Sequence, residues 1–436
     1  MNVFEELKWR GMIFDATPGA EEMLASEKIT CYTGFDPTAS SLHMGHLIPI
    51  MALARLQKHG HSPIAIVGGG TGMIGDPSGR SEERLLLNRD TIARNVAGIR
   101  AQLGRFLDFE TTTNPARLIN NGDWLLDLNL IDFLRDTGKH FTVNYMLGKE
   151  SVSARLGRES GVSFTEFSYM LLQAYDYLAL YRDHGCRLQL GGSDQWGNIL
   201  AGVDLIKRVE PVTAASGAVT GYRRGEPHGL VYPLLTSASG EKFGKSQGQN
   251  IWLNRALTSP YRFYQYWLNS DDRDMGKYLR WFTFLGQSEI ADLEEAVRLE
   301  PKKRVAQRTL ARAVTVAVHG QDGLEEAEKA TNALFGGSVA GLSAEQIEDV
   351  LGGAPRAQIA RSLLEGEGTP FDRFAVLAGL CASNAEARRL VDQGGAYLND
   401  LRIDDPRFPV RVSHLIEGRV IILRRGARTY RLVNLT

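Results

Sequence analysis

Residues 32–46 read YTGFDPTASSLHMGH and lead from a predicted strand into a predicted helix. His43 and His46 lie three residues apart, so in a helix both imidazoles face the same side. Gly45, which stands between them, has no side chain and lets a flat ligand approach the backbone closely. The first turn of a helix offers free backbone N–H groups and the positive end of the helix dipole, which attract anions. The segment therefore predicts a cradle for a phosphate or a nucleotide.

Two other interpretations of this histidine pair are a zinc site and two surface histidines. Zinc is disfavoured because no third Cys, His or acidic ligand lies nearby at the usual spacing. Two histidines alone would be unremarkable on a protein surface, but the whole string from Tyr32 to His46 is far more specific than the pair. We therefore keep the nucleotide cradle as the working hypothesis.

Three further segments resemble the strand that opens this stretch. Each is a short apolar run that ends in Gly, Asn or Asp: SPIAIVGGG (62–70), ARLINNGDW (116–124) and GCRLQLGGS (185–193). Strands that alternate with helices form parallel sheets, and ligands bind at the carboxyl ends of such strands. The sequence therefore predicts an α/β fold with its site at that edge of the sheet.

The composition is that of a globular protein. Of the 436 residues, 43% are apolar and 23% are charged, which excludes disordered and fibrous classes. A net charge of −1 gives the whole chain no drive toward nucleic acid or membrane. The three cysteines, Cys31, Cys186 and Cys381, make no disulfide framework and no metal pair. We find no signal peptide and no apolar stretch of roughly 18 residues, so we expect a cytoplasmic protein without a membrane span.

A glycine-rich segment follows the second predicted strand. Gly70, Gly72 and Gly75 form a literal G-x-G-x-x-G, the fingerprint of dinucleotide-binding proteins. The last of these glycines runs into a predicted turn instead of a helix, and no acidic residue closes a strand about 20 residues later. We therefore favour a glycine-rich floor that presents Asp76, and keep dinucleotide binding as the alternative.

Three polar side chains fall on one face of the helix predicted at residues 164–181. Tyr169, Gln173 and Asp176 lie within about 60° of arc. A solvated polar face is the ordinary interpretation of such a pattern. A phenol, an amide and a carboxylate without Lys, Arg or Glu are, however, typical of a hydrogen-bonding pocket.

Two loops complete the set of candidate segments. Residues 191–196 read GGSDQW after a predicted strand, and glycines followed by an acid and an amide suit a ribose, although a tight turn would look the same. Residues 242–246 read KFGKS in a Gly- and Ser-rich stretch. Two lysines on a flexible loop suit a clamp for phosphates, although such a loop is commonly only solvent-exposed.

The second half of the chain has a different character. Residues from 259 onward are predicted to be helical, and glycine-rich punctuation at 336–368 predicts a linker. Residues 369–436 contain 11 Arg, no Lys and 7 acidic residues, a net charge of +4. A basic module on an acidic body predicts a polyanionic partner, and a solvated Arg-rich surface is the alternative.

Two of these segments, in this order and 200 residues apart, resemble a known pair of signatures. The HMGH of residues 43–46 resembles the His-Ile-Gly-His signature of class I aminoacyl-tRNA synthetases, and the KFGKS of residues 242–246 resembles their Lys-Met-Ser-Lys-Ser. Met44 stands in place of Ile, and Phe243-Gly244 in place of Met-Ser; no cation or imidazole is lost. Residues 32–38 and 191–196 indicate the tyrosyl branch of bacterial enzymes, and the resemblance runs essentially from end to end.

The resemblance implies an α/β architecture of several parts. A Rossmann-like parallel-sheet catalytic domain would span 1–229, with a dimer-interface insertion at about 104–190. The mobile signature loop region would span 230–258. An α-helical domain that reads the anticodon arm (259–335), the linker (336–368) and a small α+β RNA-binding domain (369–436) would follow. Within the last domain, residues 385–391 would form the helix that faces RNA, and residues 394–399 the turn and strand after it.

The resemblance also implies residue roles. Tyrosine-binding residues would be Tyr32 and Asp176 at the hydroxyl, with Asp76, Tyr169 and Gln173 at the ammonium. The ribose and the neighbouring atoms of the adenylate would contact Asp36, Gly192, Asp194 and Gln195. The phosphates and adenine would be lined by Thr38, His43, Gly45 and His46, with Lys242 and Lys245 closing over the pyrophosphate.

The implied activity is that of a tyrosyl-tRNA synthetase. L-tyrosine and ATP, with its Mg²⁺, would give tyrosyl-adenylate and pyrophosphate, and tyrosine would then pass to the 3′-terminal ribose of tRNA(Tyr). A homodimer without a protein-built metal site is expected. The alternatives are a nicotinamide-dependent oxidoreductase, a non-catalytic RNA-binding protein and the close relative specific for tryptophan. Tyr32 with Asp176 suits a phenol better than an indole.

Overall fold

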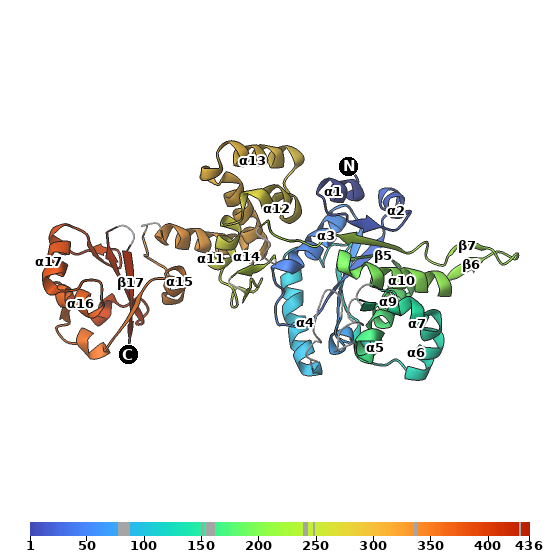
Figure 1. Ribbon diagram of the computed structural model, residues 1–436, viewed down its shortest axis with the longest axis horizontal. Coiled ribbons are helices and arrows are strands. Elements are labelled where there is room, and N and C mark those ends of the chain that lie inside the picture. The colour runs from blue at the N-terminus through green and yellow to red at the C-terminus, as the bar shows by residue number, and fades with distance from the viewer. Residues whose placement is uncertain are drawn as a thin grey trace. The chain divides into compact units, whose positions relative to one another are not determined.

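The computed structural model describes residues 1–76, 88–149, 152–153, 162–238, 243–246, 249–334, 338–426 and 429–436. The chain divides into two compact units. Unit 1 contains residues 1–257 and 268–318, and unit 2 contains residues 258–267 and 319–436. Each unit has its own sheet (Figure 1) and its own cluster of buried apolar side chains.

Unit 1 is built on a six-stranded sheet in the order β1-β8-β5-β2-β3-β4. All neighbouring strands are parallel except β1, which pairs antiparallel with β8. The strands are β1 (Asp15–Ala16), β2 (Thr30–Phe35), β3 (Ser62–Val67), β4 (Arg117–Asn120), β5 (Cys186–Gly192) and β8 (His228–Tyr232). The four strands expected from the sequence are β2, β3, β4 and β5, so the predicted α/β fold with a parallel sheet is confirmed.

Helices cover this sheet, and its central strands β8, β5, β2 and β3 are accordingly mostly buried. Every residue of β3 from Pro63 to Val67 is buried, which is why the strand reads as a continuous apolar run. The long helix α9 (Phe164–His184) begins at the Ser163 cap and ends at Gly185, whose φ of 63° favours glycine. The other helices of unit 1 are α1 (Val3–Trp9), α2 (Ala20–Ser26), α3 (Leu47–Lys58), α4 (Arg89–Leu103), α5 (Gly122–Leu125), α6 (Leu130–Asp136), α7 (Val143–Leu147), α10 (Trp196–Val209), α12 (Met275–Phe282) and α13 (Gln287–Leu299).

Short two-stranded pairs also occur in unit 1. They are β6 (Pro211–Thr213) with β7 (Val219–Tyr222), and β9 (Lys245–Ser246) with β10 (Gln249–Asn250). The helix α14 (Val305–Leu334) passes from unit 1 to unit 2 and is interrupted at Gly320, which has φ 81° and ψ 177°. Among the described helices, none combines the length and apolar character that a membrane span requires.

Unit 2 contains a five-stranded sheet in the order β11-β17-β16-β13-β14. Alternate residues of β16 face opposite sides of it, as the pleat of a strand requires: Ile421 packs with Phe371 and Phe374, and Ile422 packs with Ile347. The elements are α11 (Pro260–Leu268), α15 (Ala344–Val350), β11 (Arg356–Ile359), β12 (Thr369–Pro370), α16 (Phe371–Leu377), α17 (Asn384–Asp392), β13 (Ala396–Leu398), β14 (Leu401–Arg402), β15 (Pro409–Val410), β16 (Val420–Arg425) and β17 (Thr429–Leu435).

The contacts divide the second half of the chain differently from the sequence prediction. The expected helical domain at 259–335 is shared between the units, because residues 268–318 pack with unit 1. The segment expected as a linker, 336–368, holds α15 and β11, and β11 pairs in parallel with β17. Gly352 and Gly353 therefore mark a turn between folded elements, and this part of the segment is built into unit 2.

Candidate active site

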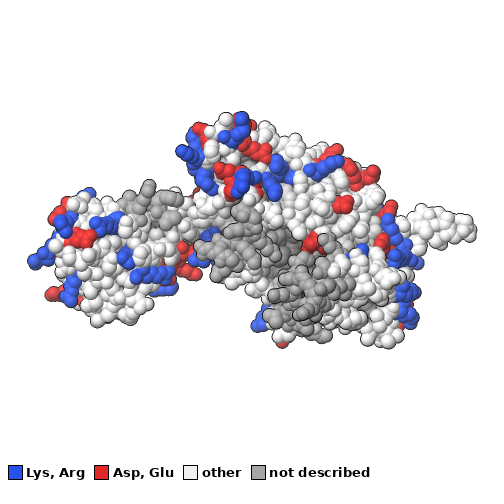
Figure 2. Space-filling model, viewed as in Figure 1, with Lys and Arg blue, Asp and Glu red and all other residues white. Residues whose placement is uncertain are grey.

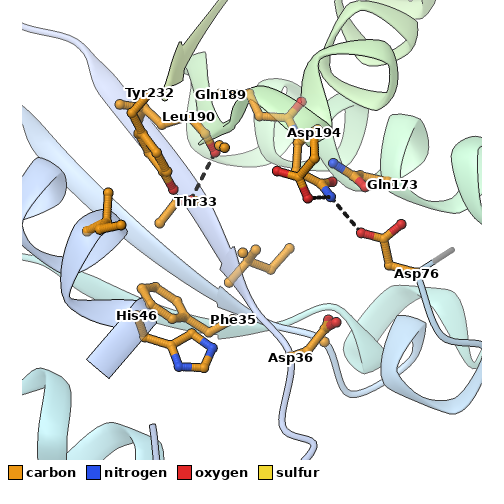
Figure 3. A pocket seen from close by; sticks show the side chains of 18 of the residues that line it. Thr33, Phe35, Asp36, His46, Asp76, Gln173, Gln189, Leu190, Asp194 and Tyr232 are labelled. Atoms are coloured by element: carbon orange, nitrogen blue, oxygen red, sulfur yellow. Dashed lines mark hydrogen bonds between the residues drawn. The ribbon is translucent and has the colours of Figure 1, made fainter. Parts of the chain in front are cut away.

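A pocket of about 540 Å³ opens at the carboxyl ends of β2 and β5 in unit 1 (Figure 3). The structure brings together in its lining all the described residues that the sequence analysis assigned to the site and whose side chains can be placed: Tyr32, Asp36, Thr38, His43, Gly45, His46, Asp76, Tyr169, Gln173, Asp176, Gly192, Asp194 and Gln195. Lys242 lies outside the described residues. The main chain of Lys245 forms β9.

A buried carboxylate and a buried phenol lie at one end of this pocket. Asp176 of α9 is 4% exposed and accepts hydrogen bonds from Asn121 Nδ2 and Trp124 Nε1, both at 2.8 Å. Tyr32 of β2 is 2% exposed, and its hydroxyl finds no hydrogen-bond partner among the described residues. A buried polar atom without a partner is costly, so a ligand that hydrogen-bonds to this hydroxyl would be favoured.

Burial raises the pKa of Asp176 to about 7, and the nearby charge of Asp36 adds to the shift. The hydrogen bonds from Asn121 and Trp124 act in the opposite direction but do not outweigh burial. A ligand hydroxyl that donates to Asp176 stabilises the charged form and so lowers this pKa on binding. The carboxylate is thus poised to accept a phenol hydroxyl at neutral pH.

The affinity for a ligand that donates a phenol hydroxyl to Asp176 should depend on pH because of this pKa. Below pH 7 the free protein must release a proton from Asp176 before the carboxylate can accept the hydroxyl, so we expect affinity to fall by up to about tenfold per pH unit. Above pH 7 affinity should be constant until other groups titrate. Equilibrium dialysis at a series of pH values measures this with a phenol-bearing ligand, for which we choose the tyrosine that the sequence resemblance implies, and Asp176→Asn should flatten the profile. Equal affinity at pH 5.5 and pH 8 in the unmodified protein would contradict it.

A second cluster of polar side chains joins α9, α10 and the loop after β3. Gln195 Nε2 donates to Asp76 Oδ2 at 2.7 Å (Figure 3). Asn198 Nδ2 donates to Gln173 Oε1 at 3.1 Å and lies 3.3 Å from Gln195 Oε1. Asp76 is 8% exposed and places a carboxylate in the pocket. The arrangement offers a carboxylate and amides to a small polar or cationic group.

The two signature histidines differ from the sequence prediction in their local structure. His43 caps a short 3-10 turn, Met44–His46, and α3 begins only at Leu47. The backbone N–H groups of residues 43–46 all have acceptors inside the protein: His46 Nδ1, the Ile251 carbonyl, His43 Nδ1 and the His43 carbonyl, respectively. The expectation that these N–H groups are free for a phosphate is therefore wrong.

The imidazole rings of His43 and His46 can offer N–H donors to a ligand instead. Each Nδ1 accepts a backbone hydrogen bond at 3.1 Å, so the neutral ring carries its proton on Nε2. Burial and the neighbouring His43, whose ring centroid lies 4.0 Å away, lower the pKa of His46 to about 3. His46 is therefore a neutral N–H donor at physiological pH and not a cation.

The two signature segments are joined through their main chains. Ile251 N–H donates to the Gly244 carbonyl at 2.9 Å, and Met44 N–H donates to the Ile251 carbonyl at 2.8 Å. Gly244 has φ 80°, and a Cβ on it would lie 2.9 Å from Met44 Cβ. Only glycine fits this position without displacing a neighbour. The two places where the sequence departs from the usual signatures thus lie against each other.

Sequence reasoning did not single out several residues of this site. Asn121 and Trp124 hold Asp176, Asn198 links Gln173 to Gln195, and buried Gln189 and Tyr232 line the pocket. Asn121 and Trp124 directly follow β4, so the rule that ligands bind at the carboxyl ends of parallel strands was the signal that could have found them.

Comparisons with known proteins identify the family. The sequence model of the class I tRNA synthetases for tryptophan and tyrosine matches residues 24–336. The chain belongs to this family. The model of the C-terminal domain of tyrosine–tRNA ligases matches residues 346–433.

Relatives that match over the full length place this chain in the tyrosine branch of the family. A tyrosine–tRNA ligase of Roseiflexus castenholzii is 49% identical over 433 residues, 99% of each chain. The tyrosine–tRNA ligase of Geobacillus stearothermophilus is 48% identical over 435 residues, again 99% of each chain. The activity is thus that of a tyrosine–tRNA ligase of class I, and the interpretation of Gly70, Gly72 and Gly75 as a dinucleotide fingerprint is wrong.

Solved structures agree with this assignment. A C-terminally truncated mitochondrial tyrosyl-tRNA synthetase of Aspergillus nidulans is 32% identical, with a TM-score of 0.68 over 77% of this chain and 94% of that chain. The corresponding protein of Coccidioides posadasii is also 32% identical, with a TM-score of 0.65 over 76% and 91%. These proteins share the parallel-sheet fold on which the pocket is built.

Proposed function

We propose that the pocket of unit 1 binds the tyrosine side chain between Tyr32 and Asp176 and activates its carboxylate with ATP. The observation that carries this proposal is the buried pair itself: a carboxylate with a pKa of about 7 and a phenol hydroxyl without a partner among the described residues. A phenol hydroxyl can donate to Asp176 and accept from Tyr32, which satisfies both groups. Phenylalanine would leave both unpaired, and tyrosyl-tRNA synthetases are an established case of this kind of selectivity.

The remaining groups orient the reacting atoms. Asp76, Tyr169 and Gln173 receive the ammonium, which directs the substrate carboxylate toward ATP. Asp36, Gly192, Asp194 and Gln195 receive the ribose and neighbouring atoms of the adenylate. Thr38, the backbone at Gly45, and the Nε2–H groups of His43 and His46 face the phosphates and adenine, with Lys242 and Lys245 over the pyrophosphate.

The chemical step needs no nucleophile from the protein. A carboxylate oxygen of tyrosine attacks the α-phosphorus in line, the bond to the bridging oxygen breaks, and pyrophosphate leaves. The reaction is accelerated by the positioning of the two substrates and by hydrogen bonds to the charge that develops on the phosphate. Members of the family use ATP, generally with Mg²⁺, and the metal enters here as part of the substrate. The 3′-terminal ribose of tRNA(Tyr) then takes the tyrosyl group from AMP.

Unit 2 carries the proposed contact with tRNA. Lys and Arg side chains are spread over its visible face (Figure 2). Helix α17, which the sequence analysis expected to face RNA, carries Arg388 with its side chain 58% exposed and the exposed Arg389. Arg424 lies over the ring of Tyr397, 3.8 Å from its centroid, on the adjoining strands. Cations beside an aromatic face suit a phosphate backbone with accessible bases.

A tRNA charging assay tests this function. The full chain should attach labelled tyrosine to tRNA(Tyr), and should not attach tryptophan to tRNA(Trp). Charging of tRNA(Trp) with tryptophan would keep the fold and the chemistry but overturn the assignment of Tyr32 and Asp176.

The proposed homodimer rests on an apolar surface within the segment at 104–190. Six large apolar side chains of this segment are 42% to 80% exposed: Leu126, Leu130, Ile131, Leu134, Val143 and Phe164. No residue of α6 is buried. An exposed apolar surface of this kind marks an interface between proteins. A second copy of the chain is the partner that we propose, as the resemblance implies.

Ile131→Asp tests this interface. A charged side chain within an apolar contact is strongly disfavoured. We therefore expect the dissociation constant of the dimer, measured by sedimentation equilibrium, to rise by at least about tenfold. Leu401→Asp, at an exposed apolar residue of unit 2, is the matched control. A chain that is monomeric before any substitution, or a dimer that Ile131→Asp leaves unchanged, would contradict the proposal.

A further inference from the structure

Phe243, in the second signature segment, is held by an aromatic cluster outside the nucleotide pocket. It is 8% exposed and stacks on Phe282, with ring centroids 5.2 Å apart and planes 5° apart. Tyr278 contacts both rings, at 5.5 Å from Phe243 and 5.9 Å from Phe282. Tyr278 and Phe282 belong to α12, which comes from the segment at 268–318. Phe243 also lines the pocket, so α12 reaches the site through this one side chain.

Helix α12 is in turn fixed to the helix that follows the first signature. Arg55 of α3 is fully buried, and its Nη2 donates to the carbonyls of Arg280, Trp281 and Thr283 at 2.8 to 3.1 Å. Arg10, the residue that caps the carboxyl end of α1, donates to the Arg280 and Leu285 carbonyls at 2.9 and 3.1 Å. Two guanidinium groups thus bind the carboxyl end of α12, where the helix dipole favours cations.

The second signature segment also contacts the first signature segment. Gly244 packs against Met44, and Ile251 links the main chains of the two signatures. This segment therefore contacts the first signature through Gly244 and α12 through the ring of Phe243. Because Lys245 lies two residues from Phe243, seating this ring reduces the freedom that the main chain at Lys245 must lose for the segment to act on a phosphate.

We propose that Tyr278 and Phe282 are positioning residues for tyrosine activation, and that they act through Phe243. This inference rests on the proposed function of the pocket. According to this inference, α12 helps to position the second signature segment during adenylate formation. Loss of the ring contact should slow adenylate formation and leave the tyrosine subsite intact, because neither residue lines the pocket.

A double-mutant cycle tests this. Phe282→Leu and Phe243→Leu should each lower kcat for tyrosine-dependent ATP–pyrophosphate exchange by about 3- to 10-fold, the effect expected for one aromatic pair. The double variant should be no slower than the slower single variant, since both changes remove the same contact. Phe14→Leu, at a phenylalanine of unit 1 that is 64% exposed and does not line the pocket, is the matched control and should keep the rate of the unmodified chain.

Tyrosine binding without ATP separates positioning from damage to the fold. The number of tyrosine molecules bound per chain and the dissociation constant should match those of the unmodified protein in Phe282→Leu and in the control, because neither residue lines the pocket. Multiplied losses in the double variant, unchanged or faster exchange in Phe282→Leu, or a parallel loss of tyrosine binding would each overturn the inference. Absence of tyrosine-dependent exchange in the unmodified chain would instead overturn the proposed function.

Discussion

Asp176→Asn should raise the KM for tyrosine by about 10- to 100-fold. In the function proposed above, the carboxylate is the buried acceptor for the substrate hydroxyl, and a hydrogen bond to a charged group contributes about 1.5–3 kcal/mol. Asparagine also places an N–H group toward Asn121 Nδ2 or Trp124 Nε1, both of which are donors. Phenylalanine makes no such bond, so the preference for tyrosine over phenylalanine should fall by a similar factor in exchange assays.

Trp124→Phe is the matched control for this variant. It removes one donor to Asp176 and leaves the carboxylate in place, so it should raise the pKa of Asp176 further and shift the pH profile of tyrosine binding upward. Selectivity above that pKa should change much less than in Asp176→Asn. An Asp176→Asn protein with an unchanged KM for tyrosine would refute the placement of the phenol in this part of the pocket.

His46→Ala should lower kcat for pyrophosphate exchange by about 10²- to 10³-fold, with little change in the KM for tyrosine. Removal of one positioned donor to a developing oxyanion typically costs about 2.7–4 kcal/mol. Because the pKa of His46 is about 3, the ring is neutral across the working range. The rate should therefore show no inflection from His46 between about pH 6 and about pH 9.

His46→Gln distinguishes a donor from a space-filling ring. The amide nitrogen of glutamine can replace Nε2–H, so this variant should recover part of the rate that alanine loses. General damage to the fold would slow both variants, and the thermal unfolding temperature of each variant checks for such damage. Equal rates in the glutamine and alanine variants, or a rate that follows protonation of an imidazole, would show that His46 does not act as a neutral donor.

The parallel sheet and most of the pocket lining follow from local sequence patterns. Short apolar runs that end in Gly, Asn or Asp locate β2, β3, β4 and β5 because strands buried on both faces need continuous apolar residues. The spacing of Tyr169, Gln173 and Asp176 places three polar groups on one face of α9. These features depend on residues that are near one another in the sequence.

Other features depend on contacts that the sequence does not show. The imidazoles of His43 and His46 accept backbone hydrogen bonds from their own turn, which a helix at this position would not have required. The division of residues 259–335 depends on the carbonyls at the end of α12, which two arginines from the first 55 residues bind. Asn198 acts on the side chains of Gln173 and Gln195, so no signature marks it.

The central claim is that this pocket activates tyrosine through the hydroxyl of its side chain. The most direct measurement is ATP–pyrophosphate exchange without tRNA, with tyrosine, tryptophan and phenylalanine offered separately. We predict exchange with tyrosine and none with the other two amino acids at the same concentration. Exchange with tryptophan, or no exchange with any of the three from folded protein, would contradict the account.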